Sequence, residues 1–129
     1  MVRYAFLGAL LAAAAAVPAL AQDPAAGEKA FGVCRACHQV GPSAKNALGP
    51  ILNGVVGRKA GSLPSYSYSS AMKDSGLTWD ETQLAKYLDD PQQVVKGTKM
   101  AFPGVKDPQK VKDIIAYLSQ YEESGQKKQ

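Results

Sequence analysis

The sequence predicts an all-α fold with long loops, and three observations lead to this prediction. An Asp-Pro pair occurs at residues 23–24 and again at 107–108; aspartate caps a helix, and proline suits its first position. Apolar residues after the second pair recur at intervals of three and four, the period of an amphipathic helix. Residues 38–68 show almost no periodicity, and no series of strands is evident along the chain.

We expect the first and last helices to pack against each other. The first is predicted to run from Pro24 through Ala30 and Phe31 towards two cysteines. The last is predicted to begin at Pro108. Its apolar stripe consists of Val111, Ile114, Ile115, Leu118 and Tyr121. Such a stripe must be buried, and the first helix offers Ala30 and Phe31 as partners.

Two further helices are predicted between these ends. Thr78 and Glu81 have the spacing of a capping box, and Pro91 prevents the helix that follows from continuing. The residues expected on its buried face are Leu84, Tyr87 and Leu88. A short helix is predicted around residues 69–74, with Gly76 as a left-handed C-terminal cap.

The long middle segment, residues 38–68, is unusual for a compact domain. Structureless loops beyond ~12–15 residues are uncommon unless they carry function or are disordered. Repeated Gly and Pro residues interrupt this segment, yet it also contains apolar residues that argue against disorder. These are Val40, Leu48, Ile51, Leu52, Val55 and Val56. We therefore expect something other than polypeptide to complete the core.

Residues 1–21 have the pattern of a cleaved secretory signal peptide. Arg3 provides a basic start, residues 5–17 an apolar core, and residues 19–21 an Ala-Leu-Ala cleavage site. The alternative is an uncleaved membrane anchor, but residues 4–21 barely reach the ~18 apolar residues that a spanning helix needs, and they include Pro18. We expect an exported protein, periplasmic if bacterial, with a single domain at residues 22–129.

The charge of the chain is mildly basic. Fifteen Lys and Arg residues against 11 Asp and Glu give a net charge of +4, and removing Arg3 with the signal peptide lowers it to +3. The basic residues are dispersed, without a block of five or six, so we do not expect nucleic-acid binding. A basic face that steers docking to a protein partner and an ordinary solvated surface both fit this composition.

Residues 34–38 read Cys-Arg-Ala-Cys-His, the attachment sequence for c-type haem. Two residues between the cysteines let one helical turn bring both thiols to the two vinyl groups of a porphyrin. The adjacent His38 is then directed at the iron as an axial ligand. The predicted cofactor is one haem c, attached by thioethers to Cys34 and Cys37.

Three other interpretations of this motif fit the sequence less well. A disulfide between the two cysteines would close a loop too small to restrict the unfolded chain much. A thioredoxin-like dithiol would accompany a βαβ pattern, which is not evident here. A zinc site would have to recruit carboxylates besides the cysteines and the single histidine.

The second axial ligand must come from Met72 or Met100 once Met1 is removed with the signal peptide. Met100 lies in a predicted irregular loop between two helices, where the backbone can direct a side chain inward. Met72 lies in the predicted short helix, and the usual role of a core methionine is to fill gaps. A methionine opposite a histidine raises the reduction potential of haem iron.

From about Gly27 to Tyr121, the chain resembles the class I cytochromes c, specifically the small bacterial relatives of mitochondrial cytochrome c. Gly27, Phe31 and Tyr117 resemble the residues that pack the family's first and last helices, and residues 49–52 resemble its GPxL segment. The resemblance implies the cytochrome c fold, in which three main helices, a short helix and long loops enclose one covalently bound haem.

The resemblance also implies roles for individual residues. The Pro50 carbonyl would hold the ring of His38, and Tyr87 would lie beside the methionine sulfur. Residues 97–102 match the segment that carries the family's methionine ligand, which selects Met100. Around a buried haem propionate the family has residues that match Arg58, Tyr68 and Trp79. The implied haem site therefore consists of Cys34, Cys37, His38, Pro50, Arg58, Tyr68, Trp79, Tyr87 and Met100, with His38 and Met100 on the iron.

The sequence departs from the mitochondrial pattern at several positions. Met72 stands where an asparagine is usual near the haem, and Asn46 replaces a histidine that ties two loops together. Gln92 and Gln93 replace two lysines of the docking face. The lysines that remain there are Lys45, Lys99 and Lys106. We expect docking to depend on salt, but less than for a full ring of lysines.

The resemblance implies a soluble, monomeric carrier of single electrons in a respiratory or photosynthetic chain, not an enzyme. Its partners would be membrane or soluble redox proteins. One alternative is a haem enzyme or gas-binding sensor with an open sixth coordination position. Another is the same carrier tethered to the membrane by an uncleaved N-terminal segment.

Overall fold

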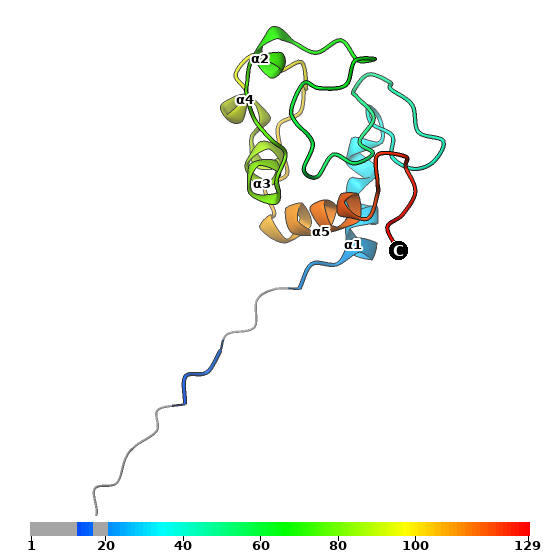
Figure 1. Cartoon of the computed structure of the whole chain (residues 1–129). Coiled ribbons are helices and arrows are strands. Elements are labelled where there is room, and N and C mark those ends of the chain that lie inside the picture. Colours follow the sequence, from blue (N-terminus) through cyan, green and yellow to red (C-terminus); the bar gives the residue numbers. More distant parts are fainter. Residues whose placement is uncertain (1–12, 17–20) are drawn as a thin grey trace, which may run out of the picture.

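The computed structural model describes residues 13–16 and 21–129, and this part of the chain is helical with long loops (Figure 1). Its elements are α1 (Pro24–Ala30), the 3₁₀ helix η1 (Phe31–Cys34), α2 (Ser70–Lys73), α3 (Glu81–Asp89), α4 (Pro91–Val94) and α5 (Pro108–Ser119). The β pairing within the described residues is limited to isolated bridges. The predicted all-α fold is confirmed.

The predicted signal peptide lies outside the described residues, except for residues 13–16 and Ala21. None of the helices in the part that the structure describes is long and apolar enough to cross a membrane.

Both Asp-Pro pairs begin helices as predicted. The Asp23 carboxylate accepts hydrogen bonds from the amides of Ala25 and Ala26, at 3.0 and 3.2 Å. Asp107 accepts in the same way from the amide of Gln109, at 2.9 Å. These carboxylates satisfy amides that have no partner inside the first turn. Helix α5 buries the predicted stripe up to Leu118, but it ends at Ser119, so Tyr121 lies beyond the helix.

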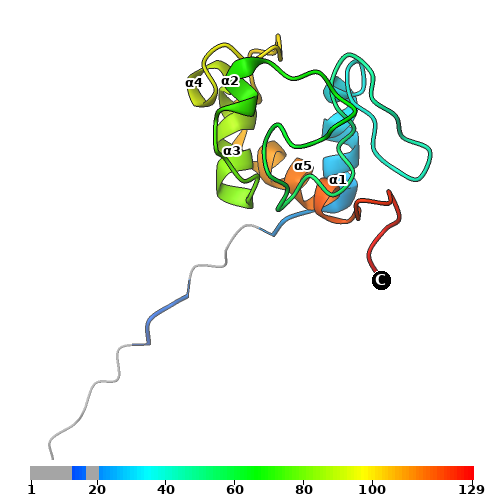
Figure 2. The same cartoon turned by 45° about the horizontal axis from the view of Figure 1, so that its top comes forward.

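Helices α1 and α5 cross in direct backbone contact. A Cβ atom on Gly27 would lie only 1.9 Å from the carbonyl oxygen of Asp113 and 2.9 Å from Cβ of Tyr117. Next to this crossing, the fully buried ring of Phe31 lies 5.4 Å from that of Tyr117. The predicted pairing of the two helices is confirmed. Figure 2 shows α1 and α3 on opposite sides of the domain with α5 between them.

Helix α3 has the predicted buried face, but its predicted N-cap was wrong. Asp80, and not Thr78, caps the helix by accepting a hydrogen bond from the amide of Gln83 at 2.7 Å. Thr78 instead forms a β-bridge with Lys59. Because Thr78 is held in this extended pairing, the helix can start only after it. The residues buried on α3 are Leu84, Tyr87 and Leu88.

Pro91 ends α3 as predicted, but it also begins α4, which the sequence analysis did not predict. The Asp90 side chain accepts a hydrogen bond from the amide of Gln93 at 3.2 Å and so caps this single turn. The short helix α2 is confirmed, with Ser69 as its N-cap and Gly76 in the left-handed region at φ 68°.

The irregular middle segment is tied together by a buried asparagine. Asn53 is 5% exposed, and its side chain accepts from the amide of Gly41 at 2.8 Å and donates to the Gly41 carbonyl at 3.0 Å. The C-terminal turn covers this pair, because a Cβ atom on Gly125 would lie 2.2 Å from the Gly41 oxygen. The loop has few regular backbone hydrogen bonds of its own, so these side-chain contacts hold it in place.

We predict that Gly27→Ala destabilises the protein, because the added methyl group would collide with the backbone of α5. The expected loss is about 3 kcal/mol in the free energy of unfolding, measured by denaturant titration of the haem-containing protein. Gly32→Ala is the matched control, since a Cβ atom at Gly32 meets nothing within 4 Å. Equal stability of the two variants would contradict the close crossing of α1 and α5.

Candidate functional site

The helices and the middle loop enclose a cavity of about 570 Å³. Its walls are mostly apolar, with side chains from η1, α3 and α5. Its volume is typical of a site for a sizeable organic ligand. All nine residues of the site inferred from the sequence line it, namely Cys34, Cys37, His38, Pro50, Arg58, Tyr68, Trp79, Tyr87 and Met100.

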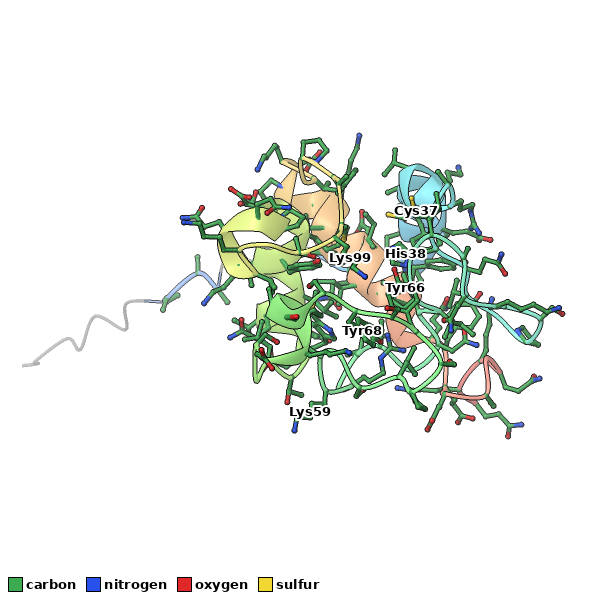
Figure 3. All side chains as sticks on the ribbon, turned by 90° about the horizontal axis from the view of Figure 1, so that it is seen from above. Cys37, His38, Lys59, Tyr66, Tyr68 and Lys99 are labelled. Atoms are coloured by element: carbon green, nitrogen blue, oxygen red, sulfur yellow. The ribbon has the colours of Figure 1, made fainter. Side chains whose placement is uncertain are left out.

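A turn after η1 places the Cys-x-x-Cys-His motif on the cavity wall. The amides of Cys37 and His38 both donate to the carbonyl of Cys34, at 3.1 and 2.9 Å. Neither cysteine forms a disulfide, and burial raises the pKa of the Cys34 thiol to about 11. In Figure 3, Cys37 and His38 lie on the side of η1, and Lys99 lies on the facing loop.

The orientation of the His38 ring is set by Pro50. The ring nitrogen Nδ1 lies 2.7 Å from the Pro50 carbonyl oxygen. A carbonyl can only accept, so Nδ1 carries the proton and Nε2 retains its lone pair. A Cβ atom on Gly49 would lie 2.4 Å from the ring, so this position needs glycine. Burial lowers the pKa of His38 and favours the neutral imidazole, the form that ligates metals.

The segment that carries Met100 is organised around Thr98, a residue whose role was not predicted from the sequence. Thr98 is 8% exposed, and its hydroxyl lies 2.8 Å from that of Tyr87. The amide of Met100 donates to the same hydroxyl oxygen at 3.3 Å. Burial raises the pKa of Tyr87, so its hydroxyl stays protonated. A lone threonine in a loop carries no periodic signal from which this contact could be predicted.

Met72 also lines the cavity and is buried. The cavity wall therefore holds two thioether side chains, one from helix α2 and one from the loop after α4.

One part of the cavity wall carries a basic group. Arg58 donates through Nη1 to the carbonyls of Ile51 and Asn53, at 3.1 and 3.0 Å. Burial lowers the pKa of this guanidinium, which nevertheless stays charged at neutral pH because an arginine pKa starts far above neutrality. Tyr68 and Trp79 line the same cavity. A buried cation together with polar aromatic groups suits a ligand that carries a carboxylate.

Side-chain hydrogen bonds hold residues 65–67 across the edge of the cavity. Asn46 donates to the Ser65 hydroxyl at 3.0 Å and accepts from the Ile51 amide at 2.8 Å. The Tyr66 hydroxyl donates to the Leu48 carbonyl at 2.6 Å. From the opposite side, the Lys99 ammonium donates to the Ser67 carbonyl at 3.1 Å. Asparagine at position 46 therefore supplies a loop tether of its own.

The donor set of this cavity fits haem. Two free thiols lie next to an imidazole with an available Nε2, and thioether sulfurs lie on the same cavity wall. Imidazole and thioether are both ligands of haem iron, and the apolar walls suit a porphyrin. The guanidinium of Arg58 suits the carboxylates that a haem carries.

Comparison with known proteins agrees with this interpretation. The family model for cytochrome c matches residues 24–122. The cytochrome c2 of Blastochloris viridis is 50% identical over 121 residues, which cover 94% of this chain and 95% of that protein. The cytochrome c2 of Rhodomicrobium vannielii is 54% identical over 118 residues, covering 92% and 94%. The solved structure of cytochrome cH from Methylobacterium extorquens superposes with a TM-score of 0.72 at 57% identity, covering 75% and 97%.

We predict that Asn46→Ala loosens the edge of the cavity, because the Ile51 amide and the Ser65 hydroxyl would lose their partner. The expected loss is about 2 kcal/mol in the free energy of unfolding, measured by denaturant titration. Lys45→Ala, at the neighbouring exposed position, should change it by less than about 0.5 kcal/mol. A loss as small for Asn46 as for Lys45 would show that the tether adds no stability.

Proposed function

This chain belongs to the cytochrome c family, and we propose that it carries single electrons between redox proteins by means of one haem, converting no substrate itself. Membership of this family implies a covalently bound haem c. The observation that carries the proposal is the shared cavity of His38 and Met100. Both side chains line this cavity, from which they would bind the haem iron and leave it closed to substrates.

In this proposal Cys34 and Cys37 hold the haem. Each thiol would hold the haem through a thioether bond to one of its two vinyl groups. The turn after η1 keeps both sulfurs and His38 on one wall of the cavity. Covalent attachment prevents loss of the cofactor by dilution, which suits a carrier that works outside the cytoplasm.

His38 would bind the iron through Nε2, and Met100 through its sulfur. Bound haem supplies an iron that alternates between the ferric and ferrous states. The Pro50 carbonyl fixes the ring of His38, and the Thr98 hydroxyl fixes the backbone of Met100. Because both ligands are held by the protein, they would keep their positions when the charge of the site changes. Little rearrangement would then oppose electron transfer.

The remaining residues of the site would bind the polar edge of the haem and exclude water. Arg58, held by two backbone carbonyls, would face a propionate, with Tyr68 and Trp79 beside it. A charged guanidinium compensates the burial of a carboxylate, which would otherwise be strongly unfavourable. Trp79 and Tyr87 pack with their ring centres 4.8 Å apart and close the cavity on the side of α3.

Redox partners would dock where the cavity opens. Val33 and Leu48 line the cavity, and they are 63% and 78% exposed. The chain has no acidic residue between Glu28 and Asp74, so every charged side chain in the segment that contains Leu48 is basic. An apolar patch within a basic surface suits a partner with acidic residues around an apolar centre.

The three lysines singled out from the sequence differ in their surroundings. Lys45 is exposed, and Lys99 lies on the cavity edge. Lys106 lies 3.9 Å from the carboxylate of Asp89, which offsets part of its charge. We therefore assign the larger share of steering to Lys45 and Lys99. Such steering should weaken with rising salt, since exposed charges are screened.

We further propose that the protein is exported, with residues 1–21 as its cleaved signal peptide. The supporting pattern is the basic start, the apolar stretch and the small-residue cleavage site. We expect the intact mass of the protein purified from its native host to correspond to residues 22–129 plus one haem. A mass that includes residues 1–21 would support the membrane-tethered form instead.

The proposed carrier is tested by redox titration and by exposure of the reduced protein to carbon monoxide. We predict that the native protein resists carbon monoxide at neutral pH, because Met100 closes the sixth position. Met100→Ala should retain covalent haem, bind carbon monoxide readily and show a lower reduction potential. An unchanged potential in this variant would assign the ligand role to Met72. Ready binding by the unmodified protein would support a gas-binding or catalytic haem protein.

A further inference from the structure

Every polar atom of Thr98 has a protein partner, and one of these partners is Gln92. The Thr98 amide donates to the Val95 carbonyl at 3.0 Å, and its hydroxyl contacts Tyr87 and the amide of Met100. Its carbonyl accepts a hydrogen bond from the Gln92 side chain, Nε2 to O, at 3.2 Å. Thr98 is buried, so a carbonyl left without this partner would be costly.

The same Gln92 side chain also contacts the preceding peptide group. Its Oε1 accepts a hydrogen bond from the amide of Gly97 at 3.4 Å. Gly97 lies in a turn after α4 with φ 92°, and its N–H is directed at the Gln92 side chain of that helix. The carboxamide of Gln92 therefore spans the turn at residues 97–98, donating at one end and accepting at the other.

Only an amide side chain of this length can make both contacts. A lysine at position 92 could donate but not accept, and a glutamate could accept but not donate. Gln93 provides the contrast within the same helix. Like Gln92, it is exposed, but the hydrogen bond that it makes joins its backbone amide to the cap residue Asp90 and does not depend on its side chain.

We propose that Gln92 is a positioning residue for the iron ligand Met100. Its two side-chain hydrogen bonds hold residues 97–98 against α4 and so keep Thr98 in place. The Thr98 hydroxyl then holds the amide of Met100. Displacement of Met100 by an external ligand requires this loop to move away from the iron, which breaks the hydrogen bonds that Gln92 makes with Gly97 and Thr98. The inference rests on the proposed role of Met100 and adds the residue that governs how long that ligation persists.

The test uses the ferric protein with its haem attached and imidazole as the displacing ligand. At saturating imidazole, the rate of displacement reports how often the loop opens. We expect Gln92→Ala and Gln92→Glu to be displaced about fivefold faster than the unmodified protein, the effect of roughly one hydrogen bond. Gln93→Ala and Gln93→Glu are the matched controls, since they make the same chemical changes one residue away. Their rates should stay within about twofold of the unmodified protein.

Thermal unfolding of all four variants, followed in parallel, separates ligand positioning from general stability. Faster displacement in the Gln92 variants, with unfolding no different from that of the Gln93 variants, supports the proposal. Equal displacement rates at the two positions would overturn it. The charge-transfer absorption of methionine bound to ferric iron, recorded first on the unmodified protein and on Met100→Ala, tests the ligand itself. Its absence from the unmodified protein would overturn the proposed function as well, and so distinguishes the two failures.

Discussion

Helices α1 and α5 approach each other so closely at Gly27 that a single added methyl group would overlap the backbone of α5. This approach lets Phe31 bury its whole side chain against Tyr117. It also places the start of η1, which follows α1 directly, against Tyr117 of α5. The wall that holds Cys34 therefore comes from the crossing of two helices at opposite ends of the chain. Without this crossing, the Cys-x-x-Cys-His motif would not lie against the apolar residues of α5.

The other walls of the cavity are formed by loops. Because these loops lack the regular backbone hydrogen bonds of helices and sheets, side-chain hydrogen bonds hold them in their conformation. Asn53 pairs with both backbone groups of Gly41, and Asn46 bridges from Ile51 to Ser65. On the opposite side, Thr98 joins the segment of Met100 to Tyr87. Each of these residues is a small polar side chain that satisfies backbone or hydroxyl groups, and such groups are unfavourable to bury without partners.

Much of the site could be predicted from the sequence because its signals are local. The Cys-x-x-Cys-His spacing, the Asp-Pro helix starts and the three-four periodicity before Leu118 each depend on residues close together in the chain. The cap of α3 shows the limit of such signals. Both Thr78 and Asp80 suit an N-cap, and the bridge from Thr78 to the distant Lys59 decides between them. Helix α4 was missed for a related reason, since Pro91 both ends one helix and starts another.

By itself, the sequence determined the helical class of the domain, the haem-attachment motif and the two methionines available as ligands, because these follow from residue type and spacing. Only the tertiary structure decided which polar side chains support the ligands. Thr98 and Gln92 carry no pattern of their own, and their partners come from the packing of α3 and α4 against an irregular turn. Contacts between segments remote in the sequence depend on the shape of the whole fold, and local propensity does not encode that shape.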